Sequence, residues 1–122
     1  MSGIITFGNR AERDRTWFCT GRGFGTLLDR VIERNRRDEP LVVVVRQGKF
    51  LSGLHLELIA GESPALADRI MHALATTADE IVSGVFRPTV DGREEEGQLR
   101  ASVAELLETL RRERSARRGR PR

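Results

Sequence analysis

The first twenty positions contain two short runs of the kind that form β-strands. The stretch GIITFGN, residues 3 to 9, predicts a strand that ends at two turn-forming residues, Gly8 and Asn9. Residues 10 to 15 are almost all charged and predict a hairpin loop. Residues 16 to 20, TWFCT, are mostly aromatic or β-branched and predict the returning strand.

A glycine-rich segment separates this hairpin from the first predicted helix. Regular structure is expected to break at three alternating glycines, Gly21, Gly23 and Gly25. Thr26 is the expected N-cap of a helix over residues 27 to 37, whose apolar residues Leu27, Leu28, Val31 and Ile32 share one face. Pro40 should end this helix, because proline disfavours helical geometry in the residue before it.

A second pair of strands is predicted between residues 41 and 59. Four consecutive valines within residues 41 to 46 predict a central strand, and residues 47 to 49 predict a hairpin turn. Residues 50 to 59 alternate and predict a half-exposed returning strand. Its apolar face would carry Phe50, Leu54, Leu56 and Leu58.

Two helices are predicted in the second half of the chain. Ser63 before Pro64 is typical of a helix start, apolar residues recur about every four positions from Leu66 to Ile81, and Gly84 supplies the stop. In the last helix the apolar stripe consists of Leu99, Val103, Leu106, Leu107 and Leu110. Glutamates precede this stripe and arginines follow it, which complements the helix macrodipole.

The predicted order of elements is therefore ββαββαα. We expect an α+β fold with a small, mostly antiparallel sheet whose helices pack on one face. Residues 1 to 110 would form a single α+β domain, and residues 111 to 122 would continue from the last helix as a basic tail that is disordered or frayed. A sheet covered on one side leaves its other face, or an edge strand, available to a partner.

Length and composition limit the class of protein. A chain of 122 residues has the usual size of one domain. Its longest apolar run, Leu41 to Val45, is too short to cross a bilayer, and the first ten residues do not resemble a secretion signal. The single cysteine, Cys19, excludes an internal disulfide framework and fits a reducing compartment. We therefore expect a cytoplasmic protein that contacts no membrane.

The positive charge of the chain is concentrated at its end. The formal net charge is +3, yet residues 111 to 122 alone carry +6, which leaves residues 1 to 110 at about −3. The arginines of this tail are Arg111, Arg112, Arg114, Arg117, Arg118, Arg120 and Arg122. They are candidates for binding the phosphates of a nucleic acid, with a strongly salt-dependent affinity. The other interpretation is a solvated tail without a ligand.

A second candidate for anion binding is the strand, glycine and helix pattern TWFCTGRGFGTLLDRV. Backbone amides at a helix N-terminus attract anions, so Arg22 and Gly23 form a candidate anion site. The P-loop requires Gly-Lys-Ser/Thr at its end and the dinucleotide fingerprint requires Gly-x-Gly-x-x-Gly, and the segment has neither. A flexible turn is the interpretation that we prefer.

The same region holds three aromatic residues among arginines. Trp17, Phe18 and Phe24 lie near Arg13, Arg15 and Arg22, an arrangement that suggests a platform on which single-stranded bases stack. Acidic neighbours dilute this patch, and core aromatics with solvated arginines are the favoured interpretation.

No set of residues in the sequence indicates a catalytic centre. Cys19 has no histidine beside it in the sequence and is expected to be a small buried residue. His55 and Glu57 share a face of the predicted strand, but two groups are too few for a metal site, and we expect a surface pair. We predict no catalytic residue, no bound metal and no cofactor.

These expectations favour a non-enzymatic protein-binding or regulatory module. One form would be an immunity or antitoxin-like protein whose mildly acidic body masks a basic partner protein. A nucleic-acid-associated protein that uses the arginine-rich tail is the alternative, and a small enzyme that uses Cys19 or His55 comes third. The apolar stripe of the last helix either covers the sheet, as we expect, or forms an antiparallel pair in a homodimer.

Overall fold

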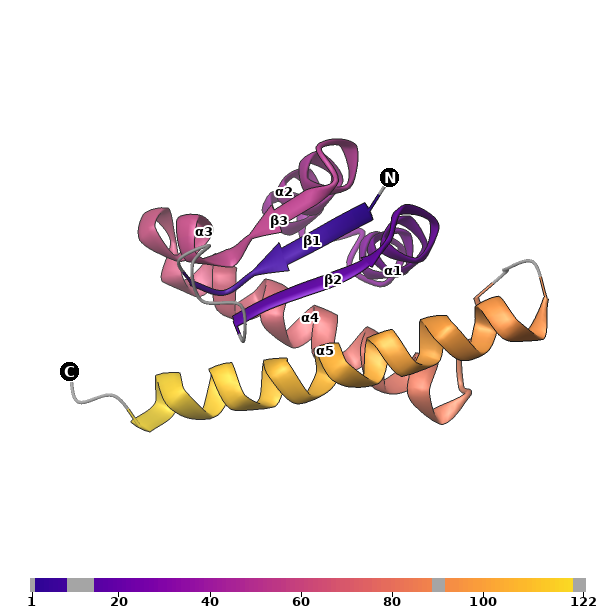
Figure 1. Cartoon of the computed structure of the whole chain (residues 1–122). Coiled ribbons are helices and arrows are strands. Elements are labelled where there is room, and N and C mark those ends of the chain that lie inside the picture. Colours follow the sequence, from indigo (N-terminus) through magenta and orange to yellow (C-terminus); the bar gives the residue numbers. More distant parts are fainter. Residues whose placement is uncertain (1, 9–14, 89–91, 120–122) are drawn as a thin grey trace.

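The computed structural model describes residues 2–8, 15–88 and 92–119, with side chains described as far as Ala116. In these ranges the elements follow one another in the order ββααβααα. The α+β class is confirmed, whereas the predicted order ββαββαα is wrong between residues 39 and 62. Figure 1 shows a small sheet with helices behind it and the last helix running along one side.

The sheet consists of a central strand, β1 (Ser2–Thr6), between β2 (Thr16–Thr20) and β3 (Gly53–His55). β2 runs antiparallel to β1, as the predicted hairpin requires, and β3 runs parallel to it. The sheet is therefore mixed, and the expectation of a mostly antiparallel sheet is wrong. Most of the loop predicted at residues 10 to 15 lies outside the described residues.

Helix α1 (Gly21–Arg34) starts directly after β2, earlier than predicted. Thr20, not Thr26, is the N-cap, and its Oγ1 accepts a hydrogen bond from the amide of Gly23 at 3.1 Å. The glycines therefore lie inside the helix and do not break it. At Gly23 a small residue is required by close packing, because a Cβ there would lie 2.8 Å from Sγ of Cys19.

Helix α2 (Glu39–Phe50) replaces the predicted strand at residues 41 to 46 and the predicted turn at residues 47 to 49. Asp38 caps it by accepting a hydrogen bond from the amide of Leu41 at 3.3 Å, and Pro40 lies in the first turn, where a proline is tolerated. The residues that it buries recur at helical spacing, and they are Leu41, Val42, Val45 and Gly48. Burial on one side of a helix therefore overrides the strand preference of the valines.

The predicted strand at residues 50 to 59 is reduced to the three residues of β3, and α3 (Leu56–Glu62) follows at once. Leu54 and Leu56 are buried as the alternation predicts. Phe50 and Leu58 are exposed, because they belong to α2 and α3, where the two-residue period of a strand does not hold.

Helices α4 (Pro64–Ser83) and α5 (Arg93–Gly119) confirm the last two predicted helices. Ser63 caps α4, and Gly84 ends it with a left-handed φ of 82°. The apolar stripe of α5 from Leu99 to Leu110 is buried as expected. α5 continues through Gly119, so the tail begins as a continuation of the last helix, as expected, and residues 120 to 122 lie outside the description.

One face of the sheet forms part of the core. Its side chains are Ile5, Trp17, Cys19 and Leu54, which alternate with residues on the other face. α1 packs on this face, since a Cβ on Gly3 would collide with the ring of Phe24. α5 also packs on it, and the indole Nε1 of Trp17 donates a hydrogen bond to the Ser102 carbonyl at 2.7 Å. No helix in the described ranges is long and apolar enough to span a bilayer.

Candidate functional site

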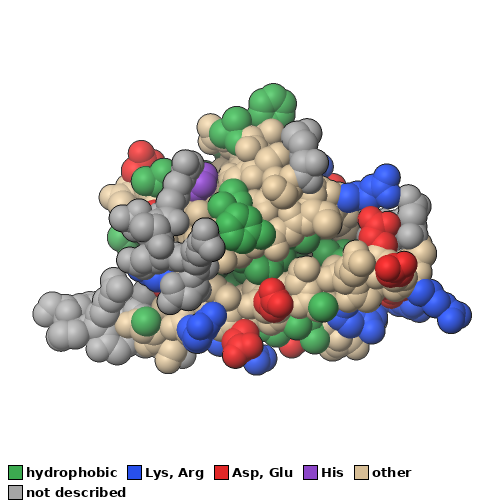
Figure 2. Space-filling model, in the orientation of Figure 1, with side chains coloured by type: hydrophobic (Ala, Val, Ile, Leu, Met, Phe, Trp, Pro, Cys, Tyr) green, Lys and Arg blue, Asp and Glu red, His purple; other side chains and the backbone are tan. Residues whose placement is uncertain are grey.

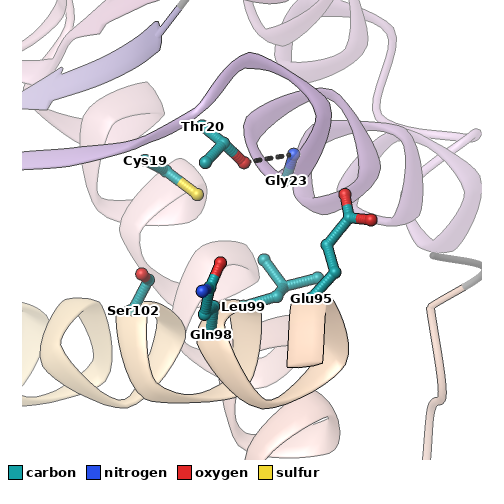
Figure 3. Close-up of a pocket in the computed structure, with 7 residues that line it drawn as sticks. All are labelled: Cys19, Thr20, Gly23, Glu95, Gln98, Leu99 and Ser102. Carbon is teal, nitrogen blue, oxygen red and sulfur yellow. Dashed lines mark hydrogen bonds between the residues drawn. The ribbon is translucent and has the colours of Figure 1, made fainter. Parts of the chain in front are cut away.

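A small hollow lies where the end of β2 and the start of α1 meet α5 (Figure 3). Cys19 and Gly23 line one side of it, and Glu95 and Ser102 line the other. Figure 3 shows Sγ of Cys19 directed into the gap between these elements. The hollow encloses about 30 Å³, enough for a bound water, whereas small-molecule pockets usually measure about 300 to 1,000 Å³. It is too small to be a substrate pocket.

Cys19 lacks the surroundings of a catalytic nucleophile. Burial raises the pKa of its thiol, and hydrogen bonding with Thr20 opposes this only in part, so the reactive thiolate is disfavoured at neutral pH. His55 lies on β3, at the other edge of the sheet and on its other face. His72 lies on α4 and lines a separate hollow near the end of α1. The predicted burial of Cys19 is confirmed.

The predicted anion site at Arg22 and Gly23 coincides with the N-terminus of α1. The amide of Gly23 is already bonded to Thr20, and the guanidinium of Arg22 lies 3.8 Å from the carboxylate of Glu95. Figure 3 shows Glu95 rising from α5 toward the start of α1. A carboxylate here complements the positive end of the helix and would repel a second anion. Anion binding at these two residues stays a prediction that the geometry does not favour.

His55 and Glu57 meet, although one ends β3 and the other lies in the first turn of α3. The hydroxyl of Thr6 joins them: it donates to the carboxylate oxygens of Glu57 at 2.7 and 2.8 Å and lies 2.9 Å from Nδ1 of His55. When Thr6 gives its single proton to Glu57, Nδ1 of His55 must be the donor of the third contact. Thr6 is fully buried, so its hydroxyl is out of reach of a substrate. The expected surface pair is thus a part-buried cluster that fastens β1 to β3 and α3.

The face of the sheet that points away from the helices is open around Phe18, whereas Thr6 at its other end is fully buried beside His55 and Glu57. In the described part of the chain no helix lies over it, and Phe18, at the middle of β2, has 61% of its surface exposed. Ile4 lies between Phe18 and Gly53 in the strand register, so the three residues form one continuous surface. We call this surface, together with exposed Ser2 and Thr20, the uncovered face.

The uncovered face carries no charge among the described strand residues, apart from the cluster of His55 and Glu57 at one end. Figure 2 shows hydrophobic side chains near its centre and charged side chains along α5 and at the periphery. Phe50, the last residue of α2, and Leu51, in the turn that leads into β3, are also exposed. A neutral surface with an exposed aromatic side chain near its centre suits a protein contact.

Sequence reasoning did not single out Phe18, because it grouped this residue with Trp17 and Phe24 as core aromatics. The structure buries Trp17 and Phe24 and exposes Phe18. The signal was present in TWFCT: if Trp17 and Cys19 point to the core, Phe18 between them must point away from it.

The predicted nucleic-acid site lies at the end of α5. We call residues 111 to 119 the basic arm. Figure 1 shows these last turns, in yellow, running past the start of β2. Arg111 and Arg112 are exposed and Arg114 is half-buried. Arg117 and Arg118 lie within α5 but have no described side chains, and Arg120 and Arg122 lie outside the description.

The only acid of the basic arm is held by the body of the protein. Nε and Nη2 of Arg15, just before β2, donate to the two carboxylate oxygens of Glu113 at 2.8 and 3.1 Å. This two-pronged contact fastens the start of the arm and neutralises Glu113.

Other kinds of site find no support in the structure or in known proteins. In the ranges that the structure describes, no group of three or more His, Cys, Asp and Glu side chains is arranged to hold a metal ion. Comparisons of the chain with protein-family models, with curated proteins and with solved structures find no match. The two candidate binding surfaces of the described chain are therefore the uncovered face and the basic arm.

Proposed function

We propose that this chain is a non-enzymatic protein-binding module and that it binds its partner through the uncovered face. The observation that carries this proposal is the 61% exposure of Phe18 beside Trp17 and Cys19, which are only 3% and 8% exposed. Aromatic side chains at the centre of an interface supply a large part of its binding energy. An exposed phenylalanine on a neutral sheet face is therefore a suitable anchor for another protein.

The chemistry of the face favours a partner protein whose contacting side chains are apolar and uncharged. A charged group of the partner would be desolvated here without an opposite charge to pair with, and this desolvation costs several kcal/mol of binding free energy. Nucleic acid is disfavoured on this face because its phosphates need cations. The charge of residues 1 to 110 suggested a protein that masks a basic partner. The face gives this idea no support, because the described strand residues place no acidic cluster on it.

The interior gives little support to the enzyme alternative. The thiol of Cys19 is buried with a raised pKa, and the hydroxyl of Thr6 is fully buried beside His55. Cys19 also borders a broad depression beside Phe18, but this depression is an open, nearly flat part of the surface that would not shield a reaction from water. The enclosed hollow at Cys19 is too small for a substrate.

Photo-crosslinking in the native cells can identify the partner. A photo-reactive phenylalanine analogue at position 18 keeps the aromatic ring and should crosslink one defined protein. The same analogue in place of Leu58, which is 67% exposed on α3, is the matched control and should not crosslink that protein. Crosslinking of the same protein from position 58 alone would contradict the proposal.

The affinity of the purified partner then measures the contribution of the face. We expect Phe18→Asp to weaken binding about 30-fold or more, the effect of removing a central aromatic anchor of about 2 kcal/mol. Leu58→Asp should leave the affinity unchanged. An equal decrease in both variants would show that the face does not bind the partner. A homodimer that Phe18→Asp dissociates would make a second copy the occupant and overturn the proposal of a different partner.

A further inference from the structure

We infer that the basic arm is a second binding site, independent of the uncovered face, and that it binds nucleic acid through the phosphate backbone. The starting observation is that, among the residues whose side chains are described, no carboxylate pairs with the arginines of the arm. Nucleic-acid binding through phosphates requires such a cluster of free cationic side chains.

The arginines of the body are mostly engaged with carboxylates. Those with a carboxylate at 2.6 to 3.9 Å are Arg15, Arg22, Arg30, Arg34, Arg69, Arg87 and Arg100. Within the described residues no such contact is found for Arg111, Arg112 or Arg114, and Arg112 reaches only the hydroxyl of Thr109. The three guanidinium groups of the arm are therefore available to an external anion.

The fold also engages the one acid that lies within residues 111 to 119. Glu113 lies among the three arginines, but both of its oxygens accept hydrogen bonds from Arg15. The contact turns Glu113 toward the body of the protein and fixes the first turn of the arm. What remains toward solvent is a helical segment with arginines on it.

Helical geometry gives these arginines a fixed spacing. Arg111 and Arg114 are three residues apart and so lie on one side of α5, and the sequence continues this spacing with Arg118 four residues later. A helix rises about 1.5 Å per residue, so these positions cover about 10 Å along its axis. Cations spaced along a helix match a phosphate backbone better than the same charges on an irregular segment, because less conformational entropy is lost on binding.

The composition of the arm distinguishes nucleic acid from a membrane. Helices that bind a lipid surface bury a face of large apolar side chains, and residues 111 to 119, RRERSARRG, contain none. All the cations of the arm are arginines, whose planar guanidinium groups bind phosphate oxygens in pairs. Nucleic acid is therefore the ligand that the arm fits.

The test compares two triple variants of the full chain that remove the same charge. Arg111→Gln, Arg112→Gln and Arg114→Gln alter the arm. Arg36→Gln, Arg37→Gln and Arg46→Gln alter three exposed arginines that also have no described carboxylate partner. Binding to fluorescently labelled 20-nucleotide DNA and RNA, single- and double-stranded, is measured by anisotropy between 50 and 200 mM salt. Far-UV circular dichroism checks that both variants are folded.

We expect the wild-type chain to bind with an affinity that falls linearly on a log–log plot against salt. For double-stranded DNA the arm variant should lower the magnitude of this slope by roughly 0.9 for each phosphate that the arm no longer neutralises, up to about 3 in all. The Arg36, Arg37 and Arg46 variant should keep the wild-type slope. An equal decrease of the slope in both variants would show that binding depends on net charge alone. Unchanged binding in the arm variant would show that the arm does not bind nucleic acid. Tighter binding to phosphatidylserine vesicles than to any of the nucleic acids would overturn the inference in favour of a membrane.

Discussion

Gly23 and Gly25 lie two residues apart in α1 but differ in what surrounds them. A Cβ on Gly23 would lie 2.8 Å from Sγ of Cys19 and 2.9 Å from Cδ1 of Leu99. A Cβ on Gly25 would meet only Cε of Lys49, at an ordinary 3.7 Å. Gly23 is therefore a packing residue between α1, β2 and α5, whereas Gly25 has room for a side chain.

This difference predicts opposite effects of two similar substitutions. Gly25→Ala should raise the free energy of unfolding by up to about 1 kcal/mol, because alanine favours the helix. Gly23→Ala should lower it by about 1 to 3 kcal/mol, because the new methyl group overpacks the contact with Cys19 and Leu99. Urea denaturation measures both values. If both substitutions were equally stabilising, α1 would not pack against α5 at this point.

At the level of single residues the sequence predicts burial better than it predicts contacts. The burial of Cys19 and of the apolar stripe of α5 follows from the pattern alone. The link from Thr6 to Glu57 joins residues 51 positions apart, and the link from Arg15 to Glu113 joins residues 98 positions apart. No local pattern indicates such pairs, because they depend on how the elements pack.

Helix α2 is the element for which local preference and the fold disagree. Valine favours strands, and four consecutive valines predicted a strand at residues 41 to 46. Asp38 followed by Pro40 is a helix-start signal, and the buried positions Leu41, Val45 and Gly48 follow helical spacing. Gly48 also allows α2 to approach β3, since a Cβ there would lie 3.0 Å from the Gly53 carbonyl oxygen. The helix-start signal and the helical spacing can be recognised in the sequence, whereas the close contact between α2 and β3 cannot.

The cap of α2 predicts a pH dependence of stability. The hydrogen bond from Arg69 lowers the pKa of Asp38 below its usual range, and the bond from the Leu41 amide adds to this. A carboxyl whose pKa is lower in the folded state stabilises the fold above its unfolded pKa of about 3.9, and this stability is lost as the pH falls through the folded pKa. Asp38→Asn keeps a capping side chain but removes the charge. The variant should therefore be less stable than wild type at pH 6, and the difference should shrink as the pH falls from about 5 to 2.

Urea denaturation at several pH values checks this prediction. Asp79→Asn is the matched control, since Asp79 is exposed on α4 and has no described ion pair. Its difference from wild type should stay nearly constant over this pH range. A constant difference for Asp38→Asn as well would show that Asp38 does not pair with Arg69 in solution.

The two later helices were predicted almost completely, unlike the middle of the chain. Their caps and their apolar spacing both extend over many residues, so the local signal and the packing agree. In the segment from residue 39 to residue 62, α2, β3 and α3 follow one another closely, and strand and helix patterns overlap there. The mixed sheet results from this segment, because β3 reaches β1 only after two helices and therefore runs parallel to it.

On the scale of the whole molecule, two surfaces of different chemistry are separated along the fold. The uncovered face is neutral, carries the exposed ring of Phe18 and is built from the strands. The basic arm is cationic and begins where the buried part of α5 ends, at Leu110. If both proposals hold, the protein connects a partner protein to a nucleic acid, and substitutions in one surface should leave binding at the other unchanged.

The most direct test of the account is whether the uncovered face is occupied in the cell. Ser2→Cys places a reactive thiol on this face in a Cys19→Ala background, and Leu58→Cys places one on α3 in the same background. The rate of modification by a membrane-permeable maleimide is measured for the purified protein and in the native cells. We predict rapid modification of both thiols in the purified protein, and several-fold slower modification in cells at position 2 alone. Equal rates at position 2 in the purified protein and in cells would contradict the account.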